Sequence, residues 1–190
     1  MALDPFAPAD LGPLRLRNRF IKAATFEGMA EQGLVSDRLI DFHRVMARGG
    51  LGMTTVAYLA VSEDGQGAPA EIVVRPEAAP GLRKLADAVH AEGAAISAQI
   101  GHAGPVAAGT GRTGLAPSRM FSAMALRFTR AVDERDMARI AQDFVQAARI
   151  LQDAGFDALE LHLGHNYLLS ASLSPALNKR KDRFGGSIAN

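Results

Sequence analysis

The chain has 190 residues, of which 48% are hydrophobic and 22% charged, a composition typical of a folded domain with one sizeable core. The net charge is +1 and no basic block stands apart from acidic residues, which argues against nucleic-acid binding. The absence of cysteine excludes disulfides, thiolate metal sites and cysteine nucleophiles. No apolar run approaches the ~20 residues of a membrane-spanning helix and no secretory signal is present, so we expect a cytoplasmic protein that binds neither membrane nor nucleic acid.

The first part of the chain alternates between strand and helix patterns. Residues 11–16 surround a Gly-Pro turn and predict a short hairpin, and residues 20–24 predict a first strand. Ser36 has the side chain of a helix cap and precedes an apolar stripe over residues 37–48. Residues 53–59 are rich in β-branched side chains and predict a second strand.

The second part continues the same alternation. Helical spacing predicts a helix over residues 77–92, and a third strand follows over 95–100. A long polar and Gly-rich connection, 101–132, leads to an amphipathic helix over 133–155 and then to a fourth strand over 158–162. The order β-α-β-α-β-α-β predicts an α/β fold with parallel strands joined by right-handed crossovers.

Polar, Gly-containing segments follow the carboxyl ends of these four strands. They lie at residues 25–33, 62–67, 101–114 and from 164 onward. Both βα-barrels and doubly wound sheets build their sites at this end of the strands. Four βα repeats amount to half of an eightfold barrel, whose usual size is ~250 residues.

The fourth strand alternates in a way that assigns its side chains to two faces. As a strand, it directs Leu159 and Leu161 to one face, and Glu160 and His162 to the other. Gly164 then ends the strand, so the residues after it are expected on a loop.

Two imidazoles and a phenol follow one another closely at this strand end. His165 and Tyr167 lie on the predicted loop, where they can converge with His162 on a ligand. The alternative is structural: one hydrogen-bonded core histidine, with a tyrosine that anchors the loop. Three such groups together favour a site for proton transfer.

Several motifs, in this order and spacing, resemble the old yellow enzyme family of FMN-dependent ene-reductases (NADH:flavin oxidoreductases). The resemblance runs from about residue 5 to 190 and is more specific than any one motif. The motifs are Asn18-Arg19-Phe20, Gln99-Ile-Gly-His102-Ala-Gly104, His162-x-x-His165-x-Tyr167, and Leu173-Ser-Pro175-x-x-Asn178-x-Arg180-x-Asp182-x-Phe184-Gly-Gly-Ser187.

The resemblance implies a (β/α)8 TIM barrel, of which residues 1–190 would form the N-terminal half, about the first four βα units. FMN would lie over the carboxyl ends of the strands. The implied flavin contacts are the backbone of Ala23, Ala24 and Thr25, the ring of Tyr58, the amide of Gln99, and His162. An amide suits the pyrimidine edge of a flavin because it offers both a donor and an acceptor.

The resemblance also implies a reaction, the reduction of the C=C bond of an enone or enoate with hydride passed from NAD(P)H through the flavin. His162 and His165 would donate hydrogen bonds to the substrate's carbonyl oxygen, where charge develops in the transition state. Tyr167 would protonate the α carbon, since a phenol with a pKa near ~10 stays protonated at neutral pH.

Two features depart from the family pattern. Ala24-Thr25-Phe26 stands where many relatives have Pro-Met followed by Thr or Cys, and Gly28 stands where some have a substrate-contacting Tyr. The sequence stops at Asn190, before the strand-five Arg and the phosphate-binding loops that the family carries after strands seven and eight. We therefore expect the chain to associate with itself or with a complementary C-terminal half.

Two other functional readings remain open at this point. One is a non-catalytic half-barrel fragment whose cofactor site is incomplete. The other is a metal-dependent barrel enzyme that uses His102, His162 and His165 as ligands with Glu160 nearby. We expect no resident metal, because no acidic residue stands at the ends of the first three strands to complete such a site. Bound flavin, bound zinc or neither would distinguish the three readings.

Overall fold

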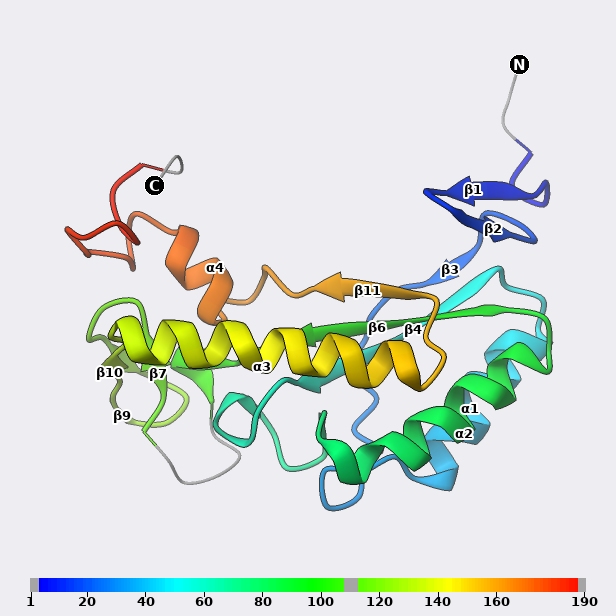
Figure 1. The fold of residues 1–190 in the computed structure, drawn as a ribbon, viewed down its shortest axis with the longest axis horizontal. Coiled ribbons are helices and arrows are strands. Elements are labelled where there is room, and N and C mark those ends of the chain that lie inside the picture. Colours follow the sequence, from blue (N-terminus) through cyan, green and yellow to red (C-terminus); the bar gives the residue numbers. More distant parts are fainter. Residues whose placement is uncertain (1–3, 108–112, 188–190) are drawn as a thin grey trace.

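The computed structural model describes residues 4–107 and 113–187 as an α/β fold. Its parallel sheet has the strand order β11, β6, β4, β3, and β5 also pairs with β4. The strands are β3 (Ile21–Lys22), β4 (Met53–Ala60), β5 (Ile72–Val73), β6 (Ala95–Gly101) and β11 (Ala158–Leu161). Figure 1 shows the arrows of β6 and β11 pointing to the same end of the sheet. The predicted parallel order is confirmed. Residues 108–112 of the predicted connection, and Asn190, lie outside the described residues.

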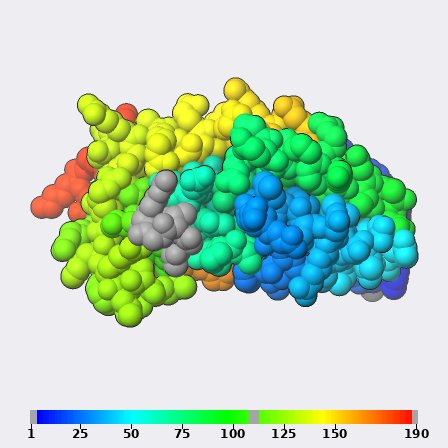
Figure 2. Space-filling view, turned by 90° about the horizontal axis from the view of Figure 1, so that it is seen from below, coloured from blue at the N-terminus to red at the C-terminus, as the bar shows by residue number. Residues whose placement is uncertain are grey.

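Three long helices lie along one side of this sheet (Figure 1). They are α1 (Asp37–Arg48), α2 (Ala79–His90) and α3 (Glu134–Asp153). The cap predicted for α1 is present, because the Ser36 hydroxyl accepts the Leu39 N–H at 3.2 Å. A capping box starts α3, in which Asp133 and Asp136 each accept the other's backbone N–H. Figure 2 views the helices from below and shows α1 and α2 packed side by side.

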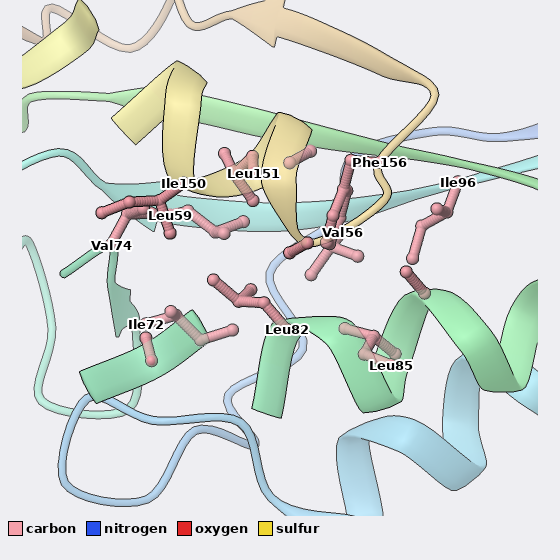
Figure 3. Packing of buried hydrophobic residues seen from close by; sticks show 14 of the residues in the cluster. Val56, Leu59, Ile72, Val74, Leu82, Leu85, Ile96, Ile150, Leu151 and Phe156 are labelled. Atoms are coloured by element: carbon pink, nitrogen blue, oxygen red, sulfur yellow. The ribbon is translucent and has the colours of Figure 1, made fainter. Parts of the chain in front are cut away.

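The hydrophobic core lies between the helices and the middle of the sheet. Val56 and Leu59 of β4, and Ile96 of β6, are fully buried against Leu82 and Leu85 of α2 (Figure 3). Each such side chain contributes about 1.5–3 kcal/mol when removed from water. The core therefore fixes the middle of the sheet, which in turn fixes where the strands end.

The first strand is shorter than predicted. Residues 20–24 were expected to be extended, but only Ile21 and Lys22 pair with β4. A second irregularity lies in β4 itself, where the pairing with β6 shifts register between Val56 and Leu59. Two residues of β4, Ala57 and Tyr58, then lie opposite one residue of β6, Gln99, which is the geometry of a β-bulge.

The carboxyl end of the sheet carries more structure than the sequence predicted. The part of the connection that the structure describes, 101–107 and 113–132, contains four short strands, β7 (Leu115–Ala116), β8 (Phe121–Ser122), β9 (Arg127–Phe128) and β10 (Arg130–Ala131). The pairs β8–β9 and β7–β10 form small antiparallel and parallel ladders, respectively. The loop expected after Gly164 leads into a short helix, α4 (Leu168–Leu173). Two-residue strands carry too little pattern to be found by periodicity.

The opposite end of the sheet carries the predicted hairpin, formed by β1 (Ala9–Leu11) and β2 (Leu14–Leu16). Arg17 follows it and donates hydrogen bonds to the carbonyl oxygens of Ala47, Leu51 and Glu92, near the ends of α1 and α2. Within the described ranges, no helix is both long and apolar enough to cross a membrane.

Candidate active site

A cavity of about 410 Å³ opens at the carboxyl ends of β4, β6 and β11. It gathers most of the residues that the sequence singled out, since Ala24, Tyr58, Gln99, His162, His165 and Tyr167 all line it. No contact in the site was predicted from the sequence for the other lining residues, which are Phe26, Ala57, Gly67, Ala68, Glu71, Val106 and Met124. Phe26 and Glu71 come from connecting segments on which no periodic pattern marks an inward-facing side chain.

His162, His165 and Tyr167 form one contiguous cluster in this cavity. The His162 Nε2 and His165 Nδ1 atoms lie 3.1 Å apart, within hydrogen-bond distance. The Tyr167 ring stands edge-on to the His162 ring, with centroids 4.7 Å apart and an interplanar angle of 84°. The convergence that was predicted for these three side chains is therefore present in the structure.

The local backbone explains how the cluster forms. His165 and Asn166 adopt left-handed conformations with φ of 56° and 55°, which non-glycine residues rarely adopt. This turn brings the His165 ring back toward His162. Tyr167 then occupies the cap position of α4, and its backbone carbonyl accepts the N–H of Ala171 at 2.8 Å. The helix, which the sequence did not predict, thus fixes Tyr167 in place.

Tyr58 also lines the cavity and packs against the cluster. Its hydroxyl donates to the Gly65 carbonyl oxygen at 3.0 Å, and its ring stands edge-on to Tyr167 with centroids 5.1 Å apart. The bulge in β4 places Tyr58 and its neighbour Ala57 both on the cavity side. Gly101 leaves room for the ring, because a Cβ there would lie 2.6 Å from Tyr58 Cε2.

Gln99 and Glu160 lie opposite each other on β6 and β11, on the face of the sheet that turns away from the helices. The Gln99 amide donates to a Glu160 carboxylate oxygen at 2.5 Å. This pairing confirms the predicted alternation of β11, in which Glu160 and His162 share a face. It also leaves the Gln99 carbonyl oxygen available as an acceptor beside the cavity.

Burial sets the protonation states in the cluster. Burial lowers the pKa of His162, and the adjacent His165 lowers it further. Burial raises the pKa of Tyr167, and the charge of Glu71 raises it further. Burial also raises the pKa of Tyr58, well above that of a free phenol. At neutral pH the phenols are therefore protonated and His162 is neutral, so the cluster holds protons it can donate.

Some predicted residues lie apart from the cavity. Ala23 and Thr25 are not among its lining residues, although Ala24 between them is. His102 is fully buried, accepts the Gly104 N–H at 3.0 Å and directs its other nitrogen toward Asp64, 3.6 Å away. It does not join His162 and His165. Within residues 4–107 and 113–187, no group of three His, Asp or Glu side chains is arranged to hold a metal ion.

The titratable side chains gather at the carboxyl ends of parallel strands, where α/β proteins, βα-barrels among them, build their sites. The model of the NADH:flavin oxidoreductase / NADH oxidase family matches residues 4–190. The chain belongs to this family, which is the old yellow enzyme family, and the predicted resemblance is confirmed.

Particular relatives agree with this assignment. The chain is 55% identical to 4,4'-dithiodibutanoate disulfide reductase of Rhodococcus erythropolis over 97% of its own length and 46% of the relative's. It is 41% identical to a metal reductase of Desulforamulus reducens, of which it covers 28%. It superposes on morphinone reductase in complex with tetrahydroNAD with a TM-score of 0.91 and 26% identity, covering 56% of that chain. The chain thus spans about half or less of these relatives, and the predicted partial TIM barrel is confirmed.

The family binds FMN and uses NAD(P)H, and the residues of the cavity fit a flavin. Ala24 and Ala57 offer small, apolar walls, whereas Gln99 offers an amide at the inner face of the sheet. These are the groups that a planar ring with one hydrogen-bonding edge requires.

Proposed function

We propose that the chain forms the substrate and flavin-ring side of an FMN-dependent reductase that acts on the C=C bond of α,β-unsaturated carbonyl compounds. The observation that carries this proposal is the convergence of His162, His165 and Tyr167 beside Gln99 in one cavity. FMN, when bound, supplies the hydride that it receives from NAD(P)H. Ala23, Ala24 and Thr25 would contact it through their backbone, and Tyr58, Gln99 and His162 through their side chains.

The two imidazoles hold the substrate in this proposal. His162 and His165 donate hydrogen bonds to the carbonyl oxygen, and that interaction replaces their hydrogen bond to each other. Negative charge develops on this oxygen as the β carbon gains hydride, so donors fixed in advance stabilise the transition state.

Tyr167 completes the reaction by giving its phenolic proton to the α carbon. The C=C bond becomes a single bond, with one hydrogen delivered as hydride and one as a proton, and the phenolate recovers its proton from solvent. The raised pKa of Tyr167 keeps the phenol protonated until this step.

A Tyr167→Phe variant tests the assignment in a complete barrel that contains this chain. Loss of a general acid should slow reoxidation by an enone by about 10²- to 10⁴-fold. Flavin reduction by NAD(P)H should stay nearly unchanged, because that half-reaction does not need the phenol. Stopped-flow absorbance separates the two half-reactions, and equal losses in both would contradict the role of Tyr167.

A second candidate substrate is a disulfide, favoured by the 55% identity to a disulfide reductase. Hydride would then reduce one sulfur to a thiol, and the leaving thiolate would take a proton from Tyr167 or from solvent, which yields two thiols. Parallel assays with an enone and with an aliphatic disulfide on the same protein distinguish the two candidates.

We also propose that the cavity is completed by chain beyond this sheet, either a complementary C-terminal half or a second copy. The outer edges of β3 and β11 have no further partner strand within the described residues. Open edges of this kind pair readily with other strands. Size-exclusion chromatography with and without the remainder of the barrel would show which association forms.

A further inference from the structure

A buried ion pair beneath the cavity occupies a gap in the sheet. Along the edge of β4 that faces away from β6, β3 pairs as far as Thr54, and β5 begins to pair at Leu59. Between these two short strands, this edge of β4 has no neighbouring strand among the residues that the structure describes. The gap coincides with the bulge that directs Ala57 and Tyr58 into the cavity.

Two side chains bind the backbone in this gap. The Lys22 ammonium donates to the Thr55 carbonyl oxygen at 3.0 Å. A Glu27 carboxylate oxygen accepts the Ala57 N–H at 3.2 Å, and the other oxygen forms an ion pair with Lys22. In a parallel ladder, a strand residue opposite Val56 would make the same two hydrogen bonds. Its backbone N–H would donate to the Thr55 carbonyl oxygen, and its backbone carbonyl would accept the Ala57 N–H.

The pair is enclosed. The Glu27 side chain is 3% exposed and that of Lys22 is 14% exposed. The fully buried His43 of α1 lies 3.5 Å from Glu27 through its Nε2, and its Nδ1 is 2.7 Å from the Thr54 hydroxyl. A buried ion pair contributes little net stability compared with apolar side chains of the same volume, so stability alone does not account for it.

We propose that Lys22 and Glu27 are positioning residues of the flavin site, acting as one side-chain rung of the sheet. Their pair fixes the segment that holds Ala24 and Phe26 against the bulge that holds Ala57 and Tyr58. These two segments form one wall of the cavity. The inference rests on the proposed role of this wall in binding FMN.

The test compares Glu27→Gln with a double variant, Lys22→Met with Glu27→Leu. The double variant removes both buried charges, so it should fold as stably as the parent while lacking the rung. Val89→Ala, in the core away from the cavity, is the control for lost stability, and Asp10→Asn, in the exposed pair with Arg15, is the control for lost charge.

The first readout is amide hydrogen exchange measured by NMR on the chain without flavin. We expect the Ala57 amide to exchange faster in both Glu27 variants, while the amides of Ile96 and Ala98 keep their protection. The second readout is FMN titration up to millimolar concentration, followed by the resonances of residues 23–28, 57 and 58. We expect both Glu27 variants to bind on the order of tenfold more weakly, the change equivalent to one lost hydrogen bond.

Three outcomes in the variants would overturn the inference, and so would one in the parent chain. They are unchanged exchange of the Ala57 amide, parent-like FMN affinity in the double variant, or an equal loss of affinity in Val89→Ala. A parent chain whose Ala57 and Tyr58 resonances do not respond to FMN would overturn it as well. None of these readouts depends on substrate reduction, so a failure of the proposed reaction remains distinguishable.

Discussion

The middle of the sheet and its β11 margin differ in how completely their apolar side chains are buried by the rest of this chain. In the middle, Leu59, Leu82 and Ile96 have no exposed surface at all. At the margin, Leu159 and Leu161 face the same side as the helices but are 41% and 54% exposed. The middle of the sheet is therefore stabilised by packing within this chain, whereas the β11 margin leaves large apolar side chains exposed. The candidate site takes residues from both regions, with Tyr58 and Gln99 from the middle of the sheet and His162 from the end of β11.

The largest expected effect concerns FMN affinity with and without the remainder of the barrel. The family resemblance places the phosphate-binding loops outside this chain, and each charge-assisted hydrogen bond there is worth ~1.5–3 kcal/mol. Losing about three of them weakens binding by roughly 10³- to 10⁴-fold. Fluorescence titration of the chain alone should therefore give a weak dissociation constant. Sub-micromolar binding would show that the flavin site is already complete.

A core truncation in the middle of the sheet should have the next largest effect. Leu82→Ala removes a fully buried side chain from α2 and leaves a cavity against Leu59. We expect a loss of about 2–5 kcal/mol in the free energy of unfolding. Urea denaturation followed by circular dichroism measures it, and a loss below about 1 kcal/mol would mean that the core is not tightly packed.

Lowering the pH should reduce the free energy of unfolding, because two buried imidazoles resist protonation in the folded chain. Burial lowers the pKa of both His43 and His162 below the ordinary value of 6.5. As the pH falls through the window just below 6.5, the unfolded chain binds protons that the folded chain does not, so stability decreases. Melting temperatures measured between neutral and mildly acidic pH should fall, and less steeply in His43→Gln. A flat profile in the parent chain would contradict the prediction.

The smallest expected change in stability is that of a substitution at the β11 margin. Leu161→Ala in the chain alone should change stability by no more than about 0.5 kcal/mol, because the side chain has little to pack against. In the presence of the remainder of the barrel, the same change should weaken association, which light scattering or sedimentation can follow. If Leu161→Ala is instead as costly as Leu82→Ala in the isolated chain, the margin is already covered by a second copy.

The sequence predicted the long elements well, because their patterns repeat over several turns. Helices α1 and α3 carry both a stripe and a capping side chain, and β4, β6 and β11 lie within one residue of their expected ends. Prediction from the sequence failed where contacts between distant segments, and not a local pattern of side chains, determine the backbone conformation. The first strand was expected to continue through residues 23 and 24, yet the side chains of Lys22 and Glu27 bind the β4 backbone where that strand would have paired.

The candidate site shows the same limit. His162, His165 and Tyr167 were found because they crowd one strand end, and Gln99 because of its motif. Glu71 was not found, because its place in the cavity depends on a turn in which its carboxylate accepts the Gly67 N–H at 2.6 Å. Such a contact has no periodicity that a sequence could display.

The missing side chain at Gly101 has a consequence for how this site can change over evolutionary time. Its Cβ position is occupied by the Tyr58 ring, and it also lies 3.1 Å from His162 Cβ. The side chains at positions 58 and 101 therefore compete for the same space, so a substitution at one position limits which residues the other can accept. Across diverging descendants of this chain, we expect a large aromatic at position 58 to co-occur with glycine at 101, and any side chain gained at 101 to follow a smaller residue at 58.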